Sequence, residues 1–208
     1  MENAVFQESL VPSGYLSWSD YWTALGMPWR MEPPIDEARR QYLNACRDVR
    51  PNIKLGVYPF RDEAGGIALT RADVEWLLAT HESDGIVGPV DRGDPAQRKR
   101  TGLDLRGAIF TGEDLTSLPL ARLQGGLVGH DKRQVSEHEQ EMAALHLQGT
   151  ALSYAHLEDA VLAHCHLEGA ALHRAHLEGA NLYGAHLEAD SPADCTPPPS
   201  MPTATSGE

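Results

Sequence analysis

The stretch AHLEDAVLAHCHLEGAALHRAHLEGANLYGAHLEA, residues 155–189, decides the fold of this chain, because leucine returns in it at every fifth position. A period of five matches neither the 3.6-residue turn of an α-helix nor the two-residue alternation of a strand. A small residue stands two positions before each of these leucines, and the other positions are mostly polar. This pattern predicts a short strand that buries the large and the small residue and bends at every unit.

The five-residue unit also extends toward the N-terminus. Nine unbroken pentads run from residue 145 to 189, with leucine at the centre of each. Four looser pentads occupy residues 103–122, and their central residues are Leu105, Phe110, Leu115 and Leu120. Because the two arrays are out of phase with a period of five, the residues between them, about 123–144, are expected to be an insertion. In it, Ser136 followed three residues later by Glu139 predicts the start of a short helix.

The repeats resemble those of the pentapeptide repeat family of bacterial proteins, whose unit is roughly A-(D/N)-L-x-x. The resemblance implies a mainly β fold, a right-handed quadrilateral β-helix in which four pentads complete one coil. It also implies that the leucine and the preceding small residue point inward, while the other three residues point outward. For this chain we expect roughly three coils, about 4.8 Å apart.

Three regions are expected along the chain. Residues 1–100 form a small N-terminal helical region and a connector, residues 101–189 form the repeat β-helix with its insertion, and residues 190–208 form a disordered Pro-rich tail. Helices are expected near residues 34–50 and 69–82, where apolar residues recur at helical spacing behind capping signals. The N-terminal aromatic residues are expected to build the core of their region or to cover the open end of the solenoid. They are Trp18, Tyr21, Trp22, Trp29 and Trp76.

The charge balance limits the partners of the protein. The 208 residues include 17 Lys and Arg against 30 Asp and Glu, a net charge of −13. This surplus of acid argues against direct binding of nucleic acid, which needs a basic face, and against binding to an anionic membrane surface. No apolar run suits a signal peptide or a membrane span, and the three cysteines, Cys46, Cys165 and Cys195, are far apart. We therefore expect a cytoplasmic protein.

Histidine is the strongest candidate for chemistry. It recurs every ten residues, directly before a central leucine, at His146, His156, His166, His176 and His186. With four pentads in a coil, these residues form two outward ladders on opposite faces, with rings about 5 Å apart. Such rows, followed by Glu or Gln two positions later, offer ligands for Zn²⁺ or Ni²⁺. A flat ladder leaves an ion exposed, however, whereas zinc sites use converging ligands, so the sequence predicts no metal site.

Motifs of catalysis are absent from the sequence. It has no G-x-S-x-G, no P-loop, no HExxH and no CxxC pair. Cys165, between His164 and His166, falls at an inward small position and is expected in the core. The adjacent carboxylates Glu113 and Asp114 are interpreted as surface charge. We therefore expect no catalytic residue, no cofactor and no enzyme activity.

Three functions remain as interpretations. The first is a non-enzymatic scaffold that presents its outward faces to a protein partner, since the outward residues of a solenoid vary freely. The second is implied by the resemblance, because some family members mimic DNA and act on a topoisomerase. The acidic balance fits this role, but three coils span only about 15 Å. The third is metal binding through the histidine ladders. The first interpretation is preferred, with the partner unidentified.

Overall fold

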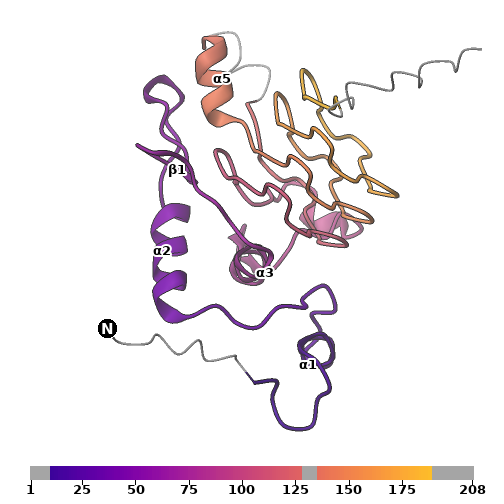
Figure 1. Cartoon of the computed structure of the whole chain (residues 1–208). Coiled ribbons are helices and arrows are strands. Elements are labelled where there is room, and N and C mark those ends of the chain that lie inside the picture. Colours follow the sequence, from indigo (N-terminus) through magenta and orange to yellow (C-terminus); the bar gives the residue numbers. More distant parts are fainter. Residues whose placement is uncertain (1–9, 128–134, 189–208) are drawn as a thin grey trace, which may run out of the picture.

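The computed structural model of the chain describes residues 10–127 and 135–188, and its repeats wind into stacked coils (Figure 1). Isolated parallel β-bridges hold neighbouring coils together. His146 bridges His166, and His166 bridges His186. The other sides of the coils are joined by the pairs Ala151–Ala171, His156–His176 and Val161–Asn181. The bridges recur five residues apart along the chain and join residues twenty apart, so four pentads complete one coil, as expected.

The interior of the coils is built from the residues that the pentad pattern placed there. The central leucines at 147, 152, 157, 162 and 167 are at most 2% exposed. The residues two positions earlier, which are small except for Leu145, are buried as well, and the hydroxyl of Thr150 donates to the carbonyl of Phe110 at 2.8 Å. Each corner is turned by the second residue after the leucine, which has a positive φ. Glycine fills several of these corners, including Gly149 and Gly169, because it adopts this conformation without strain.

The insertion leaves the stacking of the coils intact. Ile109 forms a bridge with His146, whereas a strict period of twenty residues would place its partner at position 129. Gln124 bridges both Asp104 and Val161, so it still belongs to a coil, and the insertion begins later than the expected position 123. The extra residues are therefore accommodated at one corner between Gln124 and His146.

Helix α5 (Glu137–Ala143) lies in this insertion and begins at the expected cap. The side chain of Ser136 accepts the backbone N–H of Glu139, and the side chain of Glu139 accepts the backbone N–H of Ser136. This reciprocal pair satisfies two of the N–H groups that the first turn of a helix leaves unbonded.

The N-terminal region is mainly helical, with two small antiparallel hairpins, β1–β2 and β3–β4. Asp36 caps α2, and a capping box of Thr70 and Asp73 starts α3, close to the two helices expected from the sequence. The elements are α1 (Trp18–Ala24), α2 (Glu37–Arg47), η1 (Ile53–Leu55), β1 (Arg61–Asp62), β2 (Gly65–Gly66), α3 (Arg71–Thr80), β3 (Glu82–Ser83), β4 (Ile86–Val87) and η2 (Pro95–Gln97).

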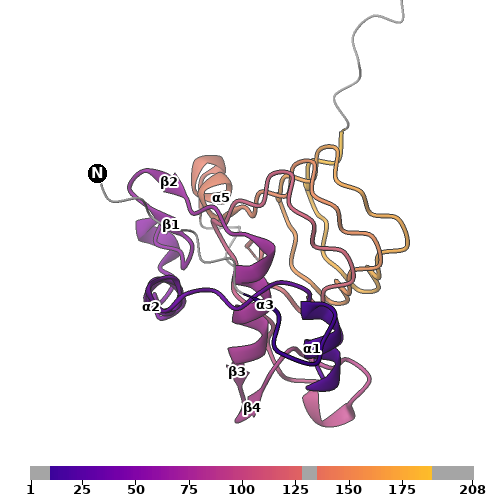
Figure 2. The same ribbon diagram turned by 60° about the horizontal axis from the view of Figure 1, so that its bottom comes forward.

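One end of the solenoid is covered by α3 and the segment before it (Figure 2). Ala68 forms a parallel bridge with Ile109 and so adds a rung beyond the first coil. On α3, Val74, Leu77 and Leu78 are buried in the same core cluster as the leucines of the coils. Mostly aliphatic residues therefore cover this end, although aromatic residues were also expected there.

The expected aromatic residues divide into two sets. Trp29 and Trp76 pack at the edge of the main core. Trp18, Tyr21 and Trp22 belong to α1 and contact one another, with ring centroids 4.8–5.9 Å apart. In Figure 1 this helix lies at the bottom of the molecule, below α3.

A buried ion pair joins the N-terminal region to the first coil. Arg71 Nε lies 2.8 Å from Glu75 Oε1, and both side chains are almost fully buried. Arg71 also donates to the carbonyls of Asp114 and Thr116 in the coil. The carboxylate of Glu75 accepts two backbone N–H groups from the loop before α2, those of Met31 and Glu32. None of the described helices combines the length and apolar character needed to cross a membrane.

Candidate functional site: the histidine ladders

Two ladders of stacked imidazoles run up opposite sides of the coils, as the ten-residue spacing predicts. In the first ladder, His146 and His166 have ring centroids 4.6 Å apart and His166 and His186 have centroids 4.7 Å apart. In the second ladder, the rings of His156 and His176 are 4.6 Å apart and nearly parallel. The strand-to-strand spacing of the bridged backbone sets these distances.

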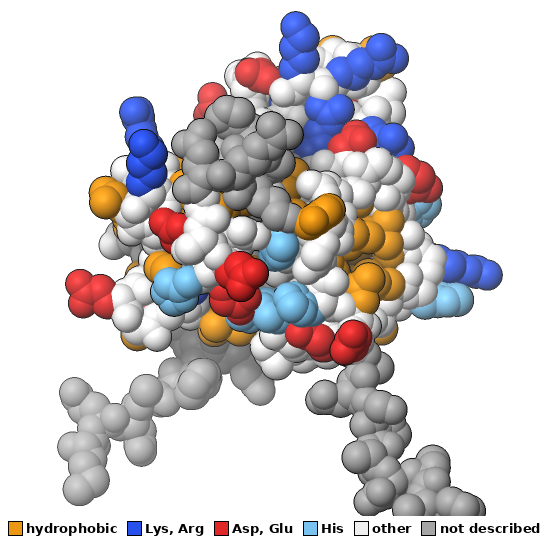
Figure 3. All heavy atoms as spheres, turned by 90° about the horizontal axis from the view of Figure 1, so that it is seen from above, with side chains coloured by type: hydrophobic (Ala, Val, Ile, Leu, Met, Phe, Trp, Pro, Cys, Tyr) orange, Lys and Arg blue, Asp and Glu red, His pale blue; other side chains and the backbone are white. Residues whose placement is uncertain are grey.

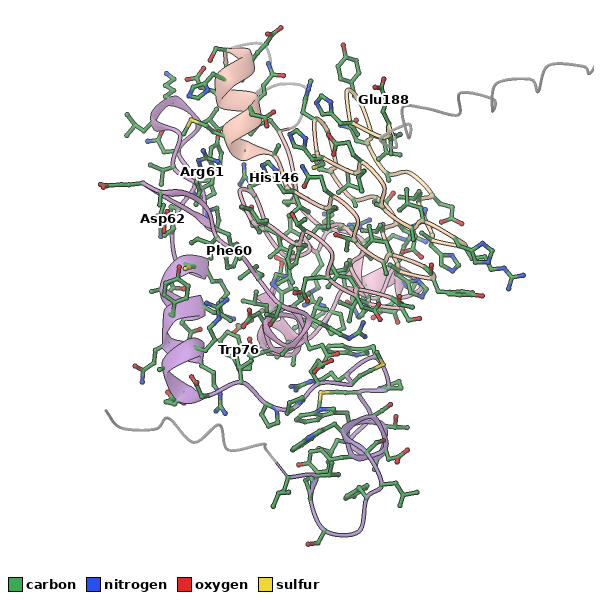
Figure 4. All side chains as sticks on the ribbon, in the orientation of Figure 1. Phe60, Arg61, Asp62, Trp76, His146 and Glu188 are labelled. Carbon is green, nitrogen blue, oxygen red and sulfur yellow. The ribbon has the colours of Figure 1, made fainter. Side chains whose placement is uncertain are left out.

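Helix α5 lies beside the first ladder and is held there by the N-terminal region. Tyr58 and Ala143 are fully buried in one small cluster, and Met142 packs against it. The Tyr58 hydroxyl donates to the carbonyl of Glu139, and the Arg61 guanidinium donates to the carbonyl of Met142. Figure 4 shows His146 at the base of this helix, between α5 and the coils.

His166 is the most heavily bonded imidazole of the first ladder. Its Nε2 lies 2.7 Å from Oε1 of Glu141 on α5, and its Nδ1 lies 3.0 Å from Oε1 of Glu168 in the same coil. Burial opposes protonation of this ring, but the hydrogen bonds to Glu168 and Glu141 outweigh it and raise the pKa of His166. The ring therefore lies between two carboxylates that favour its protonated form.

His146, one rung away, has different surroundings. Burial lowers its pKa, and the neighbouring ring of His166 lowers the pKa further. Its Nδ1 lies 3.4 Å from Nε2 of Gln148. The surroundings of His146 thus favour its neutral form, whereas those of His166, one rung away, favour the protonated form.

A cavity of about 470 Å³ opens between α5 and the upper rungs of the first ladder. Its walls come from both elements, and each lining residue carries a polar group. They are Glu137, Gln140, Glu141, His164, Tyr183 and His186. Figure 3, which views the molecule from above, shows imidazole and carboxylate side chains gathered on this face.

The second ladder is more open to solvent. The side chains of His156 and His176 are 48% and 46% exposed. Nδ1 of His156 lies 3.0 Å from Oε1 of Glu158, whereas the corresponding distance between His176 and Glu178 is 3.9 Å. All four of these residues belong to the coils.

The other residues singled out in the sequence have structural surroundings. Cys165 is fully buried, and burial raises the pKa of its thiol to about 12. Glu113 accepts the backbone N–H of Arg71, and the carboxylate of Asp114 lies 3.8 Å from the Arg71 guanidinium. These two carboxylates therefore hold the start of α3. Cys195 lies outside the described residues.

Comparisons with known proteins identify the repeats. The family model "Pentapeptide repeats" matches residues 146–188 in eight copies. One similar solved structure is HetL, a pentapeptide repeat protein involved in heterocyst differentiation regulation from the cyanobacterium Nostoc sp. strain PCC 7120. It is 32% identical over 41% of this chain and 36% of its own, with a TM-score of 0.20. A second is the pentapeptide repeat protein Rfr23 from the cyanobacterium Cyanothece 51142, 23% identical over 41% of this chain and 54% of its own, with a TM-score of 0.18.

The chain thus spans about a third to a half of the length of these two proteins. No curated protein matches it. The family match coincides with the segment in which every central position is leucine and the bridges join residues twenty apart. Residues 146–188 of the chain therefore match the pentapeptide repeat family in sequence and in the stacking of their coils.

Proposed function

We propose that this protein is a non-enzymatic scaffold of the cytoplasm, in which a right-handed quadrilateral β-helix binds a protein partner at its uncovered end. The family match supports a repeat solenoid, and solenoids bind partners through surfaces that their repeats hold in place. The N-terminal region covers the first coil. Among residues 10–127 and 135–188 no element covers the last coil, and we place the partner at that end.

The observation that carries the proposal is a difference between the last two coils. The N–H groups of Leu152, Leu157 and Leu162 each donate to the next coil. Their counterparts in the last coil, Leu172, Leu177 and Leu182, have no backbone acceptor among residues 10–127 and 135–188. Within the described part of the chain the last coil is therefore an open β edge, and such an edge is a surface for pairing with another chain.

The side chains of this edge are apolar and partly exposed. The inward leucines of the preceding coil are at most 2% exposed, whereas those of the last coil are only partly buried and Leu187 is 51% exposed. An extended segment laid along the edge would bury these leucines and accept their N–H groups. This is recognition by strand addition, in which backbone hydrogen bonds provide affinity and side-chain contacts provide specificity.

The experiment compares two variants, each of which replaces an exposed aliphatic residue with glutamate. Leu187→Glu places a charge at the open end, and Val87→Glu places the same charge at a residue that is 64% exposed on β4, in the N-terminal region. Each full-length protein is used to capture partners from the source cells, and its coil content is checked by circular dichroism. We expect a discrete protein partner that the wild type and Val87→Glu retain and Leu187→Glu loses.

A partner that binds all three proteins equally contradicts end-on binding. The molar mass in solution, measured by light scattering, separates a foreign partner from a second copy of the chain. A dimer that Leu187→Glu dissociates would show that the edge pairs with a second copy of the chain. The proposal of a different protein as the partner would then be wrong.

A further inference from the structure

We propose that Glu141, His146 and His166 form a binding site for a divalent transition-metal ion, with Zn²⁺ as the ion that best suits the donors. The site is independent of the open end described above. The sequence argued against a metal because a ladder by itself is flat. The structure adds a third donor, Glu141, from outside the ladder.

The three side chains converge. Each offers one ligand atom, and these atoms all lie within 4.8 Å of one another. A tetrahedral ion with bonds of about 2.0–2.1 Å holds its ligands roughly 3.4 Å apart. Glu141 is half-exposed, so its carboxylate has room for the small movement that brings the three atoms to that separation.

The ligand set fits zinc. Two imidazole nitrogens and one carboxylate oxygen are donors that Zn²⁺ prefers, and a water molecule commonly completes the tetrahedron. The polar cavity beside Glu141 and His186 provides room for that water. Carboxylate-only sites favour Mg²⁺ or Ca²⁺, so the two imidazoles select against those ions.

Outer contacts orient both imidazoles. His166 Nδ1 faces Glu168, which places the Nε2 atom toward Glu141. A carboxylate on the far nitrogen of a histidine ligand is the usual support for its metal-binding nitrogen. The 2.7 Å contact between His166 Nε2 and Glu141 Oε1 marks the place where the cation would bind.

His146 has an equivalent support in Gln148. The amide oxygen Oε1 of Gln148 is buried without a hydrogen-bond partner among the described residues. The amide nitrogen Nε2 of Gln148 lies 3.4 Å from Nδ1 of His146. With the amide group of Gln148 turned over, its Oε1 accepts Nδ1–H of His146. The lone pair of His146 Nε2 is then available to the metal.

The second ladder offers a comparison within the same molecule. His156, Glu158 and His176 also place three ligand atoms within 4.8 Å of one another. All three come from the coils, and both histidines are nearly half-exposed. At the proposed site the ligands come from α5 and two successive coils, and His166 is 15% exposed. The ion would therefore be more enclosed there and would fasten α5 to the coils.

The test uses the full chain after removal of metal with EDTA. Zn²⁺ is titrated calorimetrically, and Co²⁺ is added separately because its visible absorption reports tetrahedral coordination. We expect one saturable Zn²⁺ site per chain and an intense Co²⁺ band. Glu141→Ala and His166→Ala are each expected to weaken binding at least about tenfold, as loss of a supporting or ligating group does. His176→Ala, in the second ladder, is expected to leave the affinity unchanged.

Circular dichroism confirms that each variant is folded, and Glu141→Gln repeats the test with the shape of the side chain preserved. The proposal is wrong if the wild type shows no saturable Zn²⁺ binding. It is also wrong if the site survives Glu141→Ala and is lost in His176→Ala, which would place the metal on the second ladder.

Discussion

Arg71 and Glu75, one turn apart on α3, form an ion pair of 2.8 Å in which neither side chain is more than 5% exposed. The pair is also bonded on both sides, since Arg71 reaches carbonyls of the first coil and Glu75 accepts N–H groups from the loop before α2. It therefore joins three parts of the molecule.

Removing one member of this pair should be strongly destabilising. We expect Glu75→Gln to lower the free energy of unfolding by about 3 kcal/mol, because the buried Arg71 guanidinium loses its nearest carboxylate and keeps the exposed carboxylate of Asp114 at 3.8 Å. Urea unfolding followed by circular dichroism measures the loss. Glu37→Gln removes an exposed carboxylate on α2 and should cost less than about 0.5 kcal/mol. Equal losses of stability in the two variants would show that the ion pair does not hold the N-terminal region to the first coil.

The inward and outward assignment of the repeat can be tested at two neighbouring residues. Leu157 is fully buried, whereas the side chain of His156 is 48% exposed. Leu157→Asp is expected to destabilise the protein by about 3 kcal/mol or more, since it buries a carboxylate without a partner. His156→Ala should cost less than about 0.5 kcal/mol. Thermal melts of both variants measure the two losses of stability. Losses of similar size would show that the inward and outward register is wrong.

The sequence predicts the coils well because their structure is local and periodic. The inward leucines and the two histidine ladders follow from spacing alone, since residues twenty apart must stack once four pentads make a coil. The start of α5 was also predictable, because Ser136 and Glu139 satisfy each other within one turn.

The position of α5 beside the first ladder was not predictable. The insertion breaks the period, so nothing in the spacing relates Glu141 to His166, which are 25 residues apart. Their contact depends on packing of α5 against Tyr58, 81 residues from Glu139 in the sequence. The Arg71–Glu75 pair was missed for a similar reason, because the i, i+4 spacing is typical of exposed helix pairs and its burial comes from the first coil.

Cys165 should be unreactive in the folded protein. It is buried, and its thiol pKa of about 12 leaves a negligible fraction as thiolate, the reactive form, at pH 8. We expect iodoacetamide to leave Cys165 unmodified in buffer and to modify it in urea, as measured by mass spectrometry of peptides. Rapid modification without denaturant would mean that the coils open locally at this position.

His81 should contribute to the pH dependence of stability. Burial lowers the pKa of His81 and the guanidinium groups of Arg100 and Arg47 add to this, although its bond to the Thr101 carbonyl at 2.8 Å acts in the other direction. The unfolded chain therefore takes up the proton first as the pH falls. The contribution of neutral His81 is complete above the unfolded pKa of about 6.5 and is lost as the pH falls toward the folded pKa.

We therefore expect His81→Gln, which keeps an N–H for Thr101, to reduce the loss of stability below pH 6.5. Urea midpoints of the wild type and the variant, measured from pH 8 to pH 5, give the comparison. His173→Gln, at an exposed corner of the coils, should follow the wild-type curve. A parallel pair of curves for wild type and His81→Gln would exclude His81 as a source of the pH dependence.

Mimicry of DNA is a function that the distribution of charge disfavours. Duplex DNA carries one negative charge per about 1.7 Å of its axis. On the coils, Glu158 and Glu168 each contact a histidine, and Glu158 is 9% exposed. We expect the purified protein to leave gyrase supercoiling unchanged at micromolar concentrations, in an assay titrated with the full chain. Inhibition that rises with dose and is lost in a Glu178→Gln, Glu188→Gln double variant would establish mimicry instead, because these two exposed carboxylates are the remaining acidic groups on the ladders.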